Sequence, residues 1–219
     1  MAISKLNFNS LNVTPTASKG IGFDSGADDL EATFSGGSMT FIKKLTASAS
    51  ATLSFVDGTD GVVLDDTYKE YVFTFNNMHP ATDAAFFQFN VSIDAGSNYN
   101  VAKTTTNFFA QHSEDDGTTE LYYESDHDLA QGTGFQTMTH TVGNGNDEGA
   151  SGKLTIFNPS SSVFVKHFMS EFNSYMHTNR SLNSYIAGYG NTTSAIDAVR
   201  FQMSSGNIDA GTITLYGIN

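Results

Sequence analysis

The chain has 219 residues, a length that suits one large or two small domains. It carries 10 Lys and Arg against 23 Asp and Glu, and the net charge of −13 excludes phosphate backbones and anionic membranes as expected partners. Cysteine is absent from the sequence, which excludes disulfides and thiolate ligands. Only 15% of residues are charged, and 24 Ser, 25 Thr and 18 Asn predict a surface of hydroxyl and amide groups.

The amino-terminal segment, residues 1–34, is rich in small polar residues with scattered apolar ones. Its start has no apolar stretch of signal-peptide length, so we expect synthesis in a cytoplasm without Sec export. Two interpretations stay open: an ordinary first strand, or an arm that docks on a neighbouring subunit. The docking residues of such an arm would be Ile3, Leu6, Phe8, Leu11 and Val13.

From residue 35 onward, apolar residues alternate with polar ones, as Phe87, Phe89 and Val91 do. This period of two is typical of half-buried strands, whereas helical spacing is weak throughout. The sequence therefore predicts an all-β fold, an antiparallel β-sandwich of jelly-roll type, as one domain over residues 35–219. The predicted strands lie near residues 39–45, 50–56, 71–75, 87–93, 99–110, 118–124, 152–158, 163–169, 199–203 and 213–217.

The stretch from Ser125 to Gly152 has the weakest periodicity and contains several glycines. It predicts a long exposed loop, or two short strands joined by wide turns.

Acidic residues cluster in several predicted loops, as at Asp126 and Asp128 on either side of His127. Calcium uses such oxygen ligands, but no segment matches the twelve-residue calcium loop, so the acids are interpreted as turn residues. His112, His127 and His140 are well separated along the chain, and a metal role would require folding to bring them together. We expect no metal or cofactor, with calcium as the alternative.

Catalytic motifs are also missing from the sequence. There is no Gly-x-Ser-x-Gly nucleophile elbow and no glycine-rich phosphate loop followed by lysine. We therefore expect a protein that is not an enzyme, and a glycoside hydrolase or lyase ranks last among the alternatives.

Several tyrosines lie among Ser, Asn and Gly, a pattern found both in carbohydrate-binding surfaces and in oligomer interfaces. The segment from Tyr175 to Asn191 is the best candidate contact surface. Its predicted contact residues are Tyr175, His177, Asn179, Arg180, Tyr185 and Tyr189.

Three segments carry a resemblance to a known family. The carboxyl end reads Ile196-Asp-Ala-Val-Arg-Phe-Gln-Met-Ser-Ser-Gly-Asn-Ile-Asp-Ala-Gly-Thr-Ile-Thr-Leu-Tyr-Gly-Ile218, and the runs Phe41 to Gly58 and Tyr71 to Pro80 accompany it. Together they resemble the β-sandwich module of virion proteins of marine tailed bacteriophages, especially cyanophages. The resemblance implies a jelly-roll-like fold and a structural or adhesive role on a virus particle, and it carries no catalytic residues.

Two hypotheses about function follow. The first is a virion surface protein, a head decoration or part of a tail appendage, assembled in the host cytoplasm. It would form a homo-oligomer, with a trimer as the expected state, and would contact other virion proteins. The second is a carbohydrate-recognition module for host surface glycan, which would use the segment from Tyr175 to Asn191 and calcium-holding acidic loops.

Overall fold

The computed structural model describes residues 20–23, 30–34 and 38–218. The chain divides into two compact units, Met1–Thr40 and Phe41–Asn219. In the first, β1 (Gly20–Phe23) pairs antiparallel with β2 (Leu30–Phe34). The proposed docking residues Ile3, Leu6, Phe8, Leu11 and Val13 lie outside the described residues.

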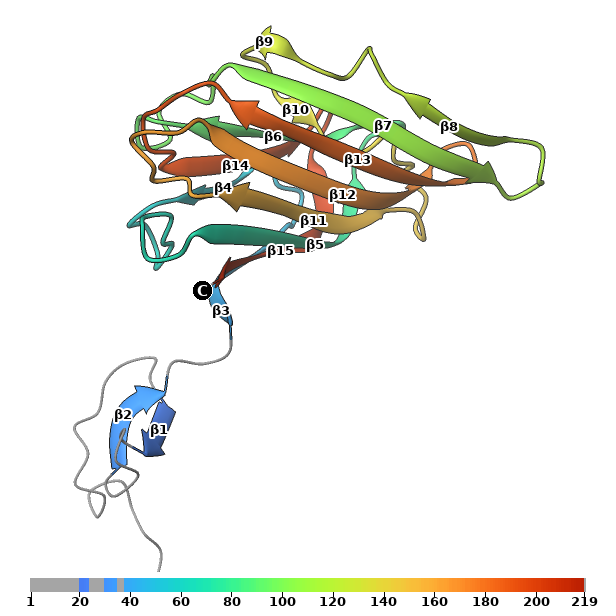
Figure 1. The fold of residues 1–219 in the computed structure, drawn as a ribbon. Helices are drawn as coiled ribbons and strands as arrows, with labels where there is room; N and C mark the ends of the chain where they lie inside the picture. The colour runs from blue at the N-terminus through green and yellow to red at the C-terminus, as the bar shows by residue number, and fades with distance from the viewer. Residues whose placement is uncertain (1–19, 24–29, 35–37, 219) are drawn as a thin grey trace, which may run out of the picture. The chain divides into compact units, whose positions relative to one another are not determined.

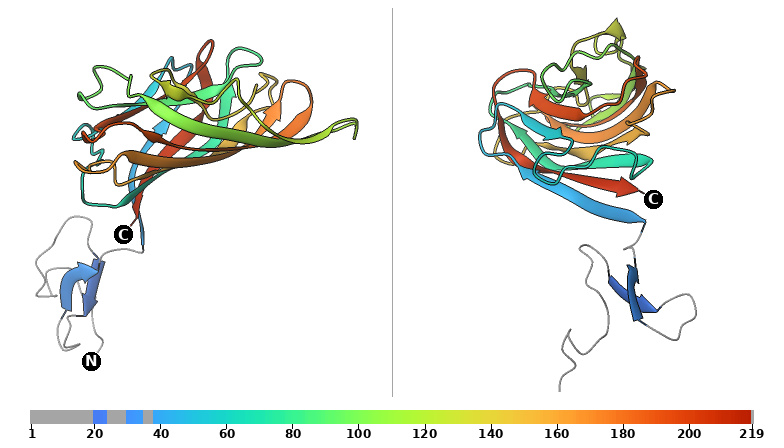
Figure 2. Two further views of the ribbon diagram at one scale, coloured as in Figure 1. Left: turned by 45° about the horizontal axis from the view of Figure 1, so that its top comes forward. Right: turned by 90° about the vertical axis from the view of Figure 1, so that its left-hand side faces the viewer.

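Two antiparallel sheets packed against each other make up the second unit (Figures 1 and 2), so the predicted all-β sandwich is confirmed. The described residues contain no helix. The small sheet has the order β10-β6-β14-β4, with β4 (Leu53–Val56), β6 (Phe87–Ser92), β10 (Gln136–Thr137) and β14 (Ala198–Met203).

The large sheet has the order β3-β15-β5-β11-β12-β13-β7-β8, and β9 also pairs with β7. Every strand pair whose register is described is antiparallel. The strands are β3 (Met39–Thr46), β5 (Glu70–Pro80), β7 (Lys103–Ser113), β8 (Thr119–Tyr123), β9 (Ala130–Gly132), β11 (Ala150–Phe157), β12 (Lys166–Met176), β13 (Arg180–Gly190) and β15 (Ile208–Ile218).

Phenylalanine fills the space between the sheets. Phe75 of the large sheet lies with its ring centroid 5.1 Å from that of Phe201 and 5.4 Å from that of Phe87, both on the small sheet. Edge-to-face contacts of this kind stabilise a core beyond the burial of apolar area alone. The alternation predicted from the sequence therefore sets which side chains enter the core.

One strand was missed by the sequence analysis. β13 was interpreted as a tyrosine-bearing surface among turns, yet Leu182, Ser184 and Ile186 alternate inward and are buried. The buried serine hides the apolar alternation, because a period-two search counts Ser184 as a surface residue. β13 pairs along its whole length with both β12 and β7.

The stretch from Ser125 to Gly152 does contain two short strands, β9 and β10, but it is not wholly exposed. Met138 and Val142 are fully buried, and the Met138 amide donates to the Phe87 carbonyl at 2.8 Å. Val142 bridges Ala85 and Met176, which belongs to the large sheet. The segment thus continues from the edge of the small sheet onto the large one.

Both strands predicted at the carboxyl end form, but they do not pair as a hairpin, because β14 belongs to the small sheet and β15 to the large one. β14 ends at Met203, and β15 begins at Ile208 after a turn in which Gly206 has φ of +68°. Glycine adopts this left-handed conformation without the steric cost that a Cβ brings. Because β14 and β15 enter different sheets, this turn connects the two layers.

Candidate functional site

One face of the large sheet packs against the core, and the other, called here the outer face, carries the side chains of β7, β8, β11, β12 and β13 that alternate away from it. Large apolar side chains are exposed there: Leu121 by 73%, Met169 by 58%, Tyr123 by 51% and Phe108 by 42%. Exposed apolar groups gathered on one face mark an interaction surface more often than single exposed residues do.

Phe108 and Tyr185 form the centre of this face. They are cross-strand partners in β7 and β13, their ring centroids lie 5.1 Å apart, and their planes differ by only 14°. Asn183 donates from Nδ2 to the Tyr185 hydroxyl at 2.7 Å, which holds the phenol ring in place. The stacked pair is therefore a preorganised aromatic platform.

A row of short side chains runs beside this platform across four strands. The strand register places Ala110 of β7, Asn183 of β13, Asn173 of β12 and Ser151 of β11 next to one another. The aromatic pair lies on one side of the row, and Tyr175 of β12 lies on the other. We call this row the cross-strand trough.

Three hollows adjoin the trough. The first, of about 540 Å³, lies over Ala110, Leu121 and Asn183; the second, of about 500 Å³, lies over Asn173, Ser181 and Tyr175. The third, of about 580 Å³, shares Asn173 and Tyr175 with the second and extends to Asn77 of β5. Because neighbouring hollows share lining residues, they form a continuous depression across the sheet.

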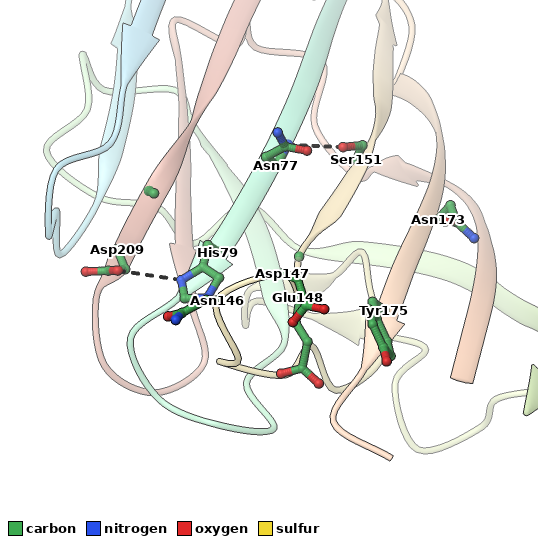
Figure 3. Close-up of a pocket in the computed structure, with 11 residues that line it drawn as sticks. Asn77, His79, Asn146, Asp147, Glu148, Ser151, Asn173, Tyr175 and Asp209 are labelled. Carbon is green, nitrogen blue, oxygen red and sulfur yellow. Dashed lines mark hydrogen bonds and ion pairs between the residues drawn. The ribbon is translucent and has the colours of Figure 1, made fainter. Parts of the chain in front are cut away.

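The end of the depression near β5 is acidic (Figure 3). Asp147 and Glu148 lie between His79 and Tyr175, and His79 faces Asp209 with 3.6 Å between Nδ1 and Oδ2. Glu148 folds back and accepts a hydrogen bond from the Gly145 amide. A Cβ on Gly143 or Gly145 would require this flexible carboxylate end to move.

Three of the six predicted contact residues lie on the outer face. Tyr175 and Tyr185 border the trough, and the neighbouring Glu114 carboxylate raises the pKa of Tyr175, so its phenol stays protonated. Tyr189 lies farther along β13, opposite His167, and lines a separate hollow of about 420 Å³.

The other three predicted contact residues lie elsewhere. Asn179 takes the left-handed conformation of the β12–β13 turn, with φ of +56°. Arg180 falls on the core-facing side of β13, where Nη1 donates to Gln111 Oε1 at 3.3 Å. His177 lies 3.0 Å from the Thr141 hydroxyl through Nδ1. The predicted contact surface is thus divided between two faces of the sheet.

Folding brings together two of the three histidines noted in the sequence. Glu124 lies 3.7 Å from His127 Nδ1 and 3.8 Å from His140 Nε2, whereas His112 pairs with Asp116 on another edge. Burial lowers the pKa of His140, and the neighbouring His127 lowers it further. Among the described residues, no group of three or more His, Asp or Glu has an arrangement that could hold a metal ion.

Several loop carboxylates act as turn residues. Asp94 accepts hydrogen bonds from the side chain and the backbone amide of Asn98 and from the Ser92 hydroxyl, and these contacts lower its pKa. Asp65 likewise accepts from the Thr67 amide, which lowers its pKa. These two acids stabilise turns, as the sequence analysis expected.

Comparisons with protein-family models, with curated proteins and with solved structures found no match to this chain. The structure by itself therefore defines the class of protein, an antiparallel β-sandwich with an exposed aromatic and amide face. Within the described part of the chain, no helix is long and apolar enough to cross a membrane.

Proposed function

We propose that this chain is a non-enzymatic surface protein of a tailed bacteriophage virion, either a capsid decoration protein or a tail appendage component. In this proposal it works through contacts between its own copies, in a trimer, and with other virion proteins, and it assembles in the host cytoplasm. The proposal starts from the resemblance of three sequence segments to phage virion modules.

One structural observation supports it. The first segment forms β3 and β4, the second forms β5, and the third forms β14 and β15. In the large sheet β15 lies between β3 and β5, and in the small sheet β14 pairs with β4. The residues that carry the resemblance are therefore neighbours in one structural unit, although more than 100 residues separate the second segment from the third.

Mass spectrometry of purified virions tests the proposal. The expected result is that peptides of this chain copurify with the major capsid protein through a density gradient, at a constant ratio. A phage lysate from which particles have been removed serves as the control. Peptides that remain wholly in that particle-free fraction would contradict a virion role.

Recognition of host surface glycan is the second candidate function. The tyrosine and amide side chains of the outer face favour it, because rigid aromatic rings and amides supply contact area at low cost in conformational entropy. A glycan array probed with and without a chelator tests it and also tests calcium in the acidic loops. Absence of binding in both conditions would leave virion structure as the better account.

A further inference from the structure

We infer that the cross-strand trough is the binding site for a linear, neutral polysaccharide, which lies across the strands from β8 toward β5. This inference rests on the second candidate function, glycan recognition, and assigns to it a site and a ligand class. A virion role for the chain does not depend on it.

The dimensions of the trough suit an extended chain. Strands within a sheet lie about 4.8 Å apart, so the path from β8 across β7, β13 and β12 to β11 is about 19 Å long. The adjoining hollows follow this path without a break between Leu121 and Asn77. A site of this length takes several sugar units in a row, whereas a single small molecule would leave most of it empty.

Side chains along the trough match the two surfaces of a sugar ring. A pyranose ring presents C–H groups on its faces, and these pack on aromatic rings such as the stacked Phe108 and Tyr185. Its hydroxyl groups lie at the ring edge, where they meet amides. Asn173 donates to the Ser181 hydroxyl at 3.1 Å, as Asn183 does to Tyr185, so both amides are held in fixed orientations.

The charges around the trough disfavour an anionic ligand. Ala110, Asn183, Asn173 and Ser151 are uncharged, and the neighbouring Lys153 and Glu171 neutralise each other at 3.3 Å. Glu114 and Glu120 line the adjoining hollows and add negative charge there. At the β5 end, Asp147 and Glu148 repel anions, and the net charge of −13 adds to that repulsion. Polyuronates and sulfated glycans are therefore disfavoured.

The test is calorimetric titration of the full chain with cellohexaose, laminarihexaose, mannohexaose and a mannuronate hexamer. We expect at least one neutral hexamer to bind and the mannuronate hexamer not to bind. Tyr185→Ala, which removes half of the platform, should weaken binding of that neutral hexamer by about tenfold or more. Ala110→Tyr should weaken this binding equally, because the tyrosine ring fills the trough without removing a contact. Tyrosine is favourable in strands, so the fold should tolerate the substitution in β7.

Phe164→Ala is the matched control, since Phe164 is a 68% exposed aromatic outside the trough. The affinity of this variant for the neutral hexamer should stay within about twofold of that of the wild type. Far-UV circular dichroism of each variant shows that the fold is kept.

Four results would overturn the inference. The first is that no neutral hexamer binds at millimolar concentration, and the second is that the mannuronate hexamer binds as tightly as a neutral one. The third is that Ala110→Tyr binds the neutral hexamer as tightly as the wild type does. The fourth is that Tyr185→Ala loses self-association but keeps its affinity for the neutral hexamer. The last would assign the face to contacts between copies. Mass spectrometry of virions is a separate measurement, so a negative result in the glycan titrations does not contradict the virion proposal.

Discussion

Lys103 Nζ donates a hydrogen bond to Asn90 Oδ1 at 2.6 Å and thereby joins β7 of the large sheet to β6 of the small one inside the core. The same ammonium donates to the Val101 carbonyl at 2.8 Å. Lys103 is fully buried, and burial lowers its pKa to about 8. A buried lysine with amide and carbonyl partners binds its proton less tightly than an exposed lysine does.

The first prediction concerns this lysine. Because the folded-state pKa of Lys103 is below its unfolded value, the unfolded chain binds more protons between pH 8 and the ordinary lysine pKa of 10.5. The free energy of unfolding of the wild type should therefore rise relative to that of Lys103→Met from pH 8 to about 9.5, by on the order of 1 kcal/mol per pH unit. Tyrosines such as Tyr71, whose raised pKa acts in the opposite direction, are common to both chains. Urea titrations across this pH range measure the difference.

Lys153→Met is the control for this prediction, since Lys153 lies on the exposed outer face. Burial also lowers the pKa of Lys166, but this lysine contributes equally to the pH dependence of stability in the wild type and in both variants. Parallel pH profiles for the wild type and Lys103→Met would contradict the prediction.

The second prediction concerns the phenylalanine core. Phe75 is 1% exposed and contacts the rings of Phe87, Phe172 and Phe201. Phe75→Ala should lower the free energy of unfolding by about 3–5 kcal/mol, because it removes buried area and leaves a cavity. Phe164→Ala should change it by less than about 0.5 kcal/mol. Chemical denaturation distinguishes them, and equal losses would show that the ring cluster is not the centre of the core.

The third prediction concerns His140. Burial lowers its pKa, as does the neighbouring His127, while Glu124 opposes the shift. In an NMR titration, the His140 ring should become protonated below its ordinary value of 6.5. Since the folded chain then binds fewer protons than the unfolded chain, stability should fall as the pH drops through 6.5.

His140→Gln should reduce that loss of stability, because glutamine has no titrating group in this environment. His177 and Arg180 also face His140 and disfavour its protonated form. A His140 ring that titrates above 6.5 would show that the Glu124 carboxylate dominates instead.

The fourth prediction concerns the amino-terminal segment. A chain that begins at Ser35 retains β3 and every later strand. It should keep its far-UV β signature and lose oligomerisation or attachment to the particle, measured by light scattering and by binding to stripped virions. A shortened chain that fails to fold would assign residues 1–34 to the sandwich core and would contradict the interpretation as an arm.

Part of the contact site follows from local pattern. The tyrosines among Ser and Asn marked Tyr175 and Tyr185 as contact residues, but alternation did not reveal the strand that carries Tyr185. Pairing of β12 with β13 puts both side chains on one face. Asn179, assigned to that surface, instead forms the β12–β13 turn, where its short polar side chain tolerates a positive φ. Arg180 was assigned to the same contact surface, but the β12–β13 register directs it to the core side.

By itself, the sequence determined the all-β class and most strands, because alternation and turn residues act over a few neighbouring positions. Only the tertiary structure decided which strands are neighbours. The trough joins Ala110, Ser151, Asn173 and Asn183, and Glu124 meets His140, through pairings between distant segments. Register depends on the packing of whole faces, and a shift of one residue would turn every trough side chain toward the core.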